Sequence, residues 1–184
     1  MNSPSDQRHI HRVLSGEKDA FRYFVRNYQE MGYSVAISIV KNDMDAKDAV
    51  QNAFIRAFRS LRSFRQDSQF STWFYKIVVN ESLKQIKRGK SNNETVSFKD
   101  DTKDYGPIFN EAMNKLEVED RNIRIDNALN LMKPKEALVL KLHYLGEQRI
   151  EEIEKTTGFT KSNIKVLLFR ARKSFSALFV QYKN

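Results

Sequence analysis

The stretch DAKDAVQNAFIRAFRSLRSFRQDSQFSTWFYKIVVNESLKQIKRGK, residues 45–90, decides how the chain folds and what it can bind. Between residues 56 and 90 it carries nine Lys or Arg and two acidic residues, a surplus of seven positive charges. Phe, Trp and Tyr side chains are interleaved with these cations. A surface of this kind can hold phosphates and stack unpaired bases, so the stretch favours a nucleic-acid partner.

The charge of the whole chain is positive but unevenly distributed. Its 184 residues have a net charge of +9 and a pI near 9.7, which favours nucleic acid or an anionic membrane surface as a partner. Residues 1–55 sum to zero, 56–90 to +7, 91–126 to −4 and 127–184 to +6. Two basic blocks therefore flank an acidic one. We expect two small domains, residues 5–90 and 122–184, joined by a flexible acidic linker over 91–121.

Several classes of protein are disfavoured by what the sequence lacks. Without Cys the chain has no disulfides, no thiolate zinc site and no cysteine catalysis. The start MNSPSDQRHIHR has no apolar core and no long apolar run follows, so we expect no signal peptide, no membrane span and a cytoplasmic location.

No sequence pattern typical of catalysis or cofactor binding is visible. A Gly-rich phosphate loop, a nucleophile elbow and paired carboxylates are all missing from the sequence. His9, His11 and His143 are scattered and lack a cluster of carboxylates beside them. We therefore expect no enzymatic activity, no catalytic residue, no metal site, no cofactor and no small-molecule substrate.

Apolar residues recur at spacings of three and four, and the chain has only six Gly and three Pro, which predicts an all-α fold. We expect residues 1–9, which are polar, to be frayed. A helix over 19–40 should be able to bend at Gly32, and the next helix, 46–61, should be capped by Asp45.

The helix that follows, ending near residue 88, has two different faces. At about 100° per residue, one narrow stripe holds a set of cations around an amide: Lys76, Asn80, Lys84 and Lys87. The opposite half holds Phe70, Phe74, Ile77 and Val78. We expect the apolar half to pack in the core and the cationic stripe to bind an anion. The alternative is that the stripe only faces solvent. Trp73 and Phe74 fit core packing better than base stacking.

The last block of the chain predicts a helix-turn-helix. A helix begins at Pro134; a shorter one from Ile150 ends at Gly158, and Thr160 can cap a long final helix. In that final helix a buried stripe is expected at Ile164, Leu168, Ala171, Phe175 and Leu178. The remaining side chains would face a DNA groove: Lys161, Ser162, Asn163, Lys165, Val166, Phe169, Arg170 and Lys173.

Four motifs in this order carry a family resemblance. They are Ala20-Phe21 with Tyr28, Ala46-x-Asp48-x-Val50-Gln51-x-x-Phe54, Phe70-x-x-Trp73-Phe74-Tyr75-x-Ile77-x-x-Asn80, and Gly158 with Arg170-Ala171-Arg172. With them, the chain resembles the extracytoplasmic function sigma factors of the sigma-70 family, the small alternative sigma factors of bacterial RNA polymerase, over nearly its whole length. Arg149 departs from the pattern, because a capping Ser is usual there.

The resemblance implies three binding surfaces. Contacts with core RNA polymerase are expected at Asp48, Gln51, Asn52 and Ile55. Melting and holding of the minus-ten promoter element is expected at Arg62, Phe64, Lys76, Asn80, Lys84 and Lys87. Reading of the minus-thirty-five element in the major groove is expected at Lys161, Ser162, Asn163, Lys165, Val166, Phe169 and Arg170. The implied partners are core RNA polymerase, promoter DNA and an anti-sigma factor, since we expect no sensory domain in this chain.

Other functions remain open at this point. The chain could be a helix-turn-helix regulator with an N-terminal dimerisation or effector domain, but such a domain has little reason to concentrate +7 in 35 residues. A protein that binds a membrane surface is a further alternative. Arg170 and Arg172 could also serve only to anchor the last helix, by ion pairs to Glu151 or Glu152.

Overall fold

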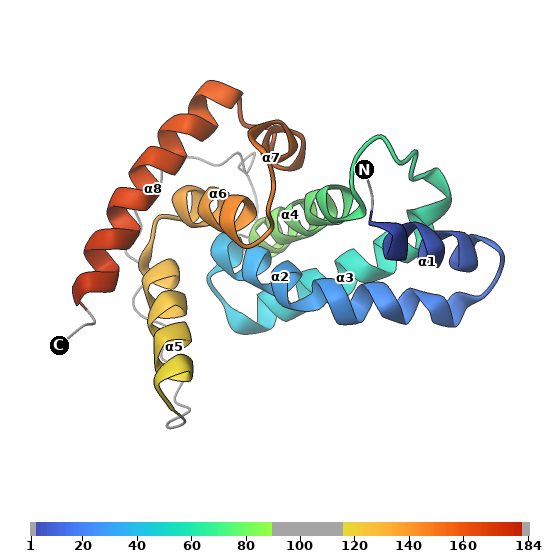
Figure 1. Ribbon diagram of the computed structural model, residues 1–184, viewed down its shortest axis with the longest axis horizontal. Helices are drawn as coiled ribbons and strands as arrows, with labels where there is room; N and C mark the ends of the chain where they lie inside the picture. Colours follow the sequence, from blue (N-terminus) through green and yellow to red (C-terminus); the bar gives the residue numbers. More distant parts are fainter. Residues whose placement is uncertain (1–2, 90–115, 182–184) are drawn as a thin grey trace.

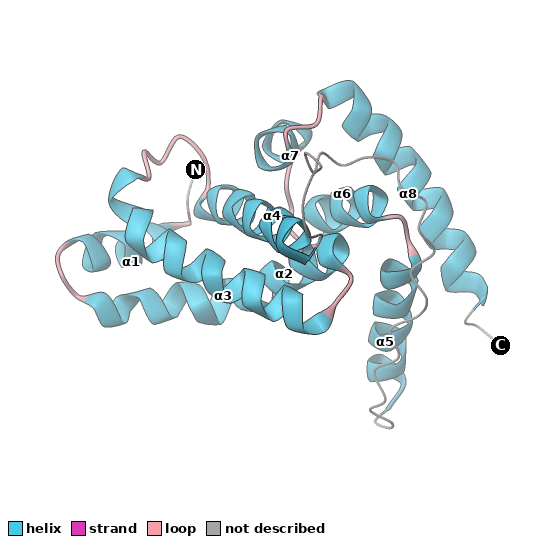
Figure 2. Cartoon of the chain, turned by 180° about the vertical axis from the view of Figure 1, so that it is seen from behind, coloured by secondary structure: helices cyan, strands magenta, loops and turns pink. Residues whose placement is uncertain are grey.

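The computed structural model describes residues 3–89 and 116–181, and every regular element in these two ranges is a helix (Figures 1 and 2). The helices are α1 (Pro4–Leu14), α2 (Arg22–Val40), α3 (Asp43–Ser60), α4 (Phe70–Gly89), α5 (Leu116–Leu131), α6 (Pro134–Tyr144), α7 (Ile150–Thr157) and α8 (Lys161–Gln181), with short 3₁₀ turns η1 (Lys18–Phe21) and η2 (Leu61–Ser63). The all-α prediction is confirmed. Most of the expected linker lies outside the described residues, and α5 already begins within its last part.

The N-terminus differs from the prediction. Residues 4–9, which we expected to be frayed, belong to α1. Ser3 caps this helix, because its Oγ accepts a hydrogen bond from the Asp6 amide at 3.0 Å, and Pro4 occupies the first turn. Ile10 and Asp6 are buried, and the Tyr28 hydroxyl donates to Asp6 Oδ2 at 2.8 Å. A polar helix is thus held by a few contacts that its composition does not reveal.

Helix α2 runs through Gly32 without a break in its helical assignment. Gly32 is buried, and a Cβ there would lie 3.3 Å from Cε1 of Phe74 on α4. The glycine therefore permits a close approach between two helices. The start of α3 also differs, because Asn42, rather than Asp45, is the cap: its Oδ1 accepts from the Asp45 amide at 3.0 Å.

Aromatic rings form the centre of the N-terminal half, residues 3–89. The ring centroids of Phe24 and Phe70 are 4.2 Å apart, and those of Phe54 and Phe74 are 4.4 Å apart. Phe74 is fully buried, as expected for a core residue, while Trp73 is half-buried at the edge of the cluster. This core fixes the helices α2, α3 and α4 against one another.

The C-terminal half, residues 116–181, packs onto the N-terminal half. Helix α6 lies against α2, and α7 lies against α4 (Figure 1). Leu138, Leu142 and Ile153 belong to the same buried cluster as Val35 and Val79. The division into domains at 5–90, 91–121 and 122–184 stays a prediction, and in this structure the helices on either side of the expected linker share apolar contacts.

Two buried lysines cross between the halves in opposite directions. Lys41 ends α2 in the left-handed conformation, with a φ of 55°, and its Nζ donates to the carbonyls of Asn130 at 2.8 Å and Met132 at 3.2 Å. Nζ of Lys141 on α6 donates to the carbonyl of Ser34 at 3.0 Å. Burial lowers the pKa of each lysine to about 8, and for Lys141 the nearby Lys41 charge adds to that effect.

Among the described residues, no helix combines the length and the apolar character that a bilayer crossing requires. Within the same residues no group of three or more His, Asp or Glu side chains is arranged to hold a metal ion.

Candidate polymerase and nucleic-acid interfaces

One face of α3 is available to a protein partner. Asp48, Gln51, Asn52 and Ile55 are all exposed, whereas Ala46, Ala49, Val50, Ala53 and Ala57 are buried on the opposite side. Met44 is also strongly exposed, and it lies one helical turn before Asp48 on this face. With Ile55 it gives this face two exposed apolar side chains among its polar ones. The sequence reading missed Met44 because a single Met near a helix start carries no periodic signal.

The cationic stripe of α4 has the predicted orientation. Lys76, Asn80 and Lys87 are exposed and Lys84 is half-exposed, while Phe70, Phe74, Ile77 and Val78 are buried on the other side. Arg62, in the turn η2, is exposed as well. The stripe therefore presents several cations and one amide to solvent, an arrangement suited to a strand of nucleic acid.

Phe64 differs from the other residues of the expected minus-ten set. Its ring stacks on Trp73 with a centroid distance of 4.8 Å, and the residue is only 8 % exposed. A ring enclosed in this way cannot serve as an open stacking platform for a base. This contact holds the turn before α4 against the core, and the place of Phe64 in the minus-ten set stays a prediction.

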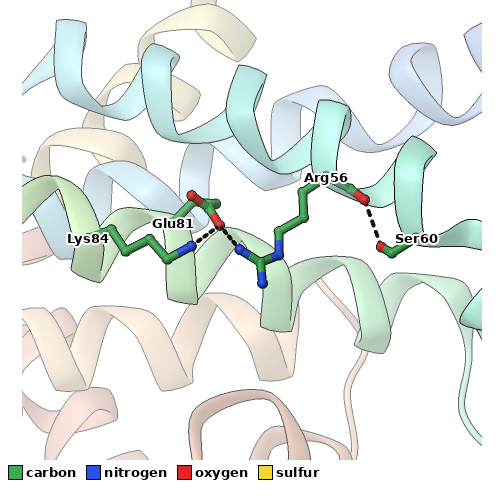
Figure 3. Close-up of polar contacts among 4 residues, drawn as sticks. All are labelled: Arg56, Ser60, Glu81 and Lys84. Atoms are coloured by element: carbon green, nitrogen blue, oxygen red, sulfur yellow. Dashed lines mark hydrogen bonds and ion pairs between the residues drawn. The ribbon is translucent and has the colours of Figure 1, made fainter.

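A cluster of charges that the sequence reading did not identify lies on the cationic face. Glu81 Oε1 accepts hydrogen bonds from Arg56 Nη1 at 3.1 Å and from Lys84 Nζ at 2.7 Å (Figure 3). Arg56 comes from α3, so the cluster joins two helices. Beside it is a shallow hollow of about 280 Å³ lined by Arg56, Asn80, Leu83, Lys84 and Lys87.

Helices α7 and α8 form the predicted helix-turn-helix. Gly158 ends α7 with a φ of 77°, a left-handed conformation that favours glycine, and Thr160 Oγ1 accepts from the Asn163 amide at 3.3 Å. At the start of α7, where Arg149 replaces the usual Ser, Glu152 Oε2 accepts from the Arg149 amide at 2.9 Å. A side chain of the first turn thus satisfies an amide at the helix start.

The outer face of α8 is open to solvent. All of the expected minus-thirty-five residues are exposed: Lys161, Ser162, Asn163, Lys165, Val166, Phe169 and Arg170. Ile164, Leu168 and Ala171 are buried, and Phe175 and Leu178 are half-buried, as the periodicity predicts. The helix therefore presents one continuous face that could enter a groove.

Arg172 is anchored, but not by the ion pair to Glu151 or Glu152 that the sequence allows as an alternative. Its Nε donates to the Tyr144 hydroxyl at 2.8 Å, and its guanidinium lies 5.7 Å from the centroid of that ring. Glu151 instead pairs with Lys161, with Nζ and Oε1 3.3 Å apart. The last helix is thus tied to α6 through Arg172 and to α7 through Lys161.

The arrangement of these faces agrees with comparisons to known families. The family model for Sigma-70 region 2 matches residues 24–92, which carry the α3 and α4 faces, and that for Sigma-70, region 4 matches residues 122–175, which carry the helix-turn-helix. The chain belongs to the sigma-70 family. Relatives of this chain that are named ECF RNA polymerase sigma factors confirm its resemblance to the extracytoplasmic function group.

Three relatives illustrate the likeness. The RNA polymerase sigma-H factor of Pseudomonas aeruginosa is 36 % identical over 86 residues, covering 47 % of this chain and 45 % of that protein. The ECF RNA polymerase sigma-E factor of Escherichia coli is 45 % identical over 76 residues, covering 41 % and 39 %. The ECF RNA polymerase sigma factor SigW of Bacillus subtilis is 25 % identical over 177 residues, covering 91 % and 93 %. The first two matches span less than half of those relatives.

Two solved structures share the fold. The sigma factor RpoE of Bartonella quintana, solved with the anti-sigma factor NepR, has a TM-score of 0.66 and 22 % identity, covering 89 % of this chain and 98 % of that one. CnrH, solved with the cytosolic domain of CnrY, has a TM-score of 0.64 and 18 % identity, covering 98 % and 99 %. Both likenesses extend over nearly the whole chain.

Proposed function

We propose that this member of the sigma-70 family binds core RNA polymerase and directs it to promoters, where it recognises and melts DNA. The observation that supports this best is the presence of three separate exposed faces. Those of α3 and α4 lie in the region 2 match and that of α8 lies in the region 4 match. We infer an initiation factor rather than an enzyme, acting in the cytoplasm with the polymerase.

The two DNA-facing surfaces suit different forms of DNA. On α4, the cations and Asn80 surround a shallow hollow that could take an unpaired base, so this face would hold the melted minus-ten element. On α8, an exposed helical face with apolar and basic side chains suits the major groove of duplex DNA. The face of α3, with Asp48 and its neighbours, would remain free for the polymerase.

The packing of the two halves implies that the chain opens on a promoter. Elements near minus ten and minus thirty-five are roughly 25 base pairs apart, or about 85 Å of B-DNA. A compact chain of 184 residues has a radius of gyration of only about 16 Å. Both elements therefore cannot be held while α6 and α7 stay against α2 and α4. We propose that polymerase binding separates the halves.

A separate inhibitor is a further part of the proposal. The resemblance to the extracytoplasmic function group implies an anti-sigma factor as partner, and a protein so named was solved together with the Bartonella quintana sigma factor. Such a partner would act by binding one or both halves of this chain.

Run-off transcription with core polymerase on templates carrying random promoters tests the proposed function. We expect defined transcripts that depend on this chain, and recovery of two sequence elements with a fixed spacing. If no promoter is selected, or if the isolated protein binds duplex DNA tightly as a dimer, the alternative of a helix-turn-helix regulator with an N-terminal dimerisation domain replaces it.

A further inference from the structure

Glu81 is the one acidic residue in the sequence of α4, and it directly follows Asn80 on a face dominated by cations. Its side chain is 12 % exposed. Oε1 accepts from both Arg56 and Lys84, so one oxygen holds a guanidinium from α3 and an ammonium from α4. Figure 3 shows Glu81 between these two cations. An acid at the centre of a DNA-facing surface needs an explanation, because it opposes the binding of phosphate.

Stability does not supply that explanation. The side chains of Arg56 and Lys84 are 59 % and 44 % exposed, and ion pairs between partly exposed long side chains contribute little to stability. What the cluster does is to hold two flexible cations in defined positions. Long side chains lose rotamer freedom when they bind a ligand, so cations that are already held bind at a lower entropic cost.

The two cations that Glu81 holds line the hollow beside the cluster. Arg56 and Lys84 line it together with Asn80, Leu83 and Lys87. Leu83 offers an apolar surface for a flat ring, and Asn80 offers an amide that can both donate and accept hydrogen bonds. The Glu81 carboxylate lies against two of the lining cations. That carboxylate offsets part of their positive charge, so it weakens the attraction of a phosphate to the hollow and leaves the binding of a neutral base unaffected.

We propose that Glu81 is a positioning residue of the minus-ten surface, which fixes Arg56 and Lys84 at the hollow and favours an unpaired base beside Asn80 over a backbone phosphate. Within the two described ranges, Lys76 and Lys87 form no ion pair with an acidic side chain, so they are left for the phosphates on either side. The inference rests on the proposed function, since it assigns a role within the surface that would hold the melted strand.

Glu81→Gln tests this role because it removes the charge and keeps the shape. The assay measures binding of the holoenzyme, core polymerase with the full chain, to two fluorescent single strands: the minus-ten element selected from random promoters and a scrambled strand of equal length. We expect affinity for the scrambled strand to be kept or raised, with a salt dependence steeper by about 0.7 in log-log slope. Preference for the selected strand should fall about tenfold.

Glu30→Gln is the matched control, because Glu30 is exposed on α2 and the substitution changes the net charge equally. This control should leave the preference for the selected strand over the scrambled strand unchanged. The unfolding midpoint of Glu81→Gln should fall by no more than about 3 °C. A proportional loss of affinity for both strands with a larger drop in midpoint would reduce Glu81 to a structural cross-link and overturn the inference.

The inference would also be overturned if Glu81→Gln and Glu30→Gln showed the same preference for the selected strand. Failure of the proposed function gives a different result, since the wild-type holoenzyme would then select no promoter and show no preference that a variant could lose.

Discussion

The α4 face and the α8 face both carry cations, but the apolar side chains of α4 are buried behind its face whereas some of those of α8 are exposed on it. On α4 the aromatic rings are turned inward: Phe70 and Phe74 are fully buried behind the stripe. On α8, Val166 and Phe169 are 47 % and 69 % exposed among Lys165 and Arg170. A surface for melted DNA can work with phosphate contacts and a hollow, whereas a helix that reads duplex DNA can use apolar contacts with thymine methyl groups. The comparison predicts separable effects of substitutions on the two faces.

The largest effect is expected from a double substitution on α4, Asn80→Ala with Lys84→Glu. It removes the amide and places a second carboxylate next to Glu81, so the face should repel the melted strand. Open-complex formation, followed by reactivity of unpaired thymines, should be abolished while binding to core polymerase survives. Loss of core binding in this variant would show that the α4 face has been assigned to the wrong partner.

Phe169→Ala addresses the other side of the comparison. Because the ring is exposed, its removal should not destabilise the fold, but it should cost roughly 1–3 kcal/mol of promoter binding through the minus-thirty-five element. Binding of the holoenzyme to the minus-ten single strand should stay unchanged. Val180→Ala, an exposed position near the far end of the same helix, is the control. Equal effects of the two variants on promoter binding would contradict a reading role for Phe169.

Asp48→Lys tests the face that neither DNA surface uses. Reversal of a charge at a protein interface should weaken association with core polymerase by about tenfold, measured as a competition with a labelled wild-type chain. Glu30→Lys, on α2, makes the same change of charge away from this face. An unchanged affinity for Asp48→Lys would remove α3 from the polymerase interface.

The smallest effect is expected where the two halves meet. Lys41 and Lys141 have a pKa near 8 when packed and near 10.5 when free, so the separated halves bind more protons between these values. Packing should therefore tighten as the pH rises from 8 toward 10.5. Below about pH 8 both lysines are charged in the packed and in the separated chain, so their contribution no longer changes with pH. Fluorescence energy transfer between labels on α3 and α8 of the free chain would measure it.

Lys141→Met provides the variant for that measurement. It keeps an apolar side chain of similar length and removes a buried charge, and the Ser34 carbonyl that loses its contact still accepts from the Ser38 hydroxyl at 2.8 Å. The packed state should be more populated and its pH dependence weaker. A larger distance between the halves would show that the charge of Lys141 stabilises the packing.

Local chemistry made much of the fold predictable. The stripe of α4 follows from the helical period, and the turn before α8 follows from a glycine that can adopt a positive φ at residue 158. Helix α1 could not be predicted, because only Asp6 and Ile10 of its residues are buried and their partners lie elsewhere in the sequence. The same limit applies to Lys41, whose acceptors are about ninety residues away.

The candidate interfaces were predictable to a similar degree. Faces set by helical period, such as that of α8, were found from the sequence, since period alone decides which side chains lie together. Glu81 was counted only as one negative charge within a basic block, because its bond to Arg56 depends on the packing of α4 against α3. The burial of Phe64 was missed for a related reason, because its ring stacks on Trp73 only once the turn has folded.

Gly32 lies where α2 comes close to both α3 and α4. The position where its missing methyl group would stand is 3.3 Å from Phe74 on α4 and 3.7 Å from Val50 on α3. An added carbon would press on the Phe74 ring, which would have to shift by a few tenths of an ångström. In the proposed function, the bare α-carbon of Gly32 therefore helps to set how the strand-holding face of α4 lies relative to the polymerase face of α3.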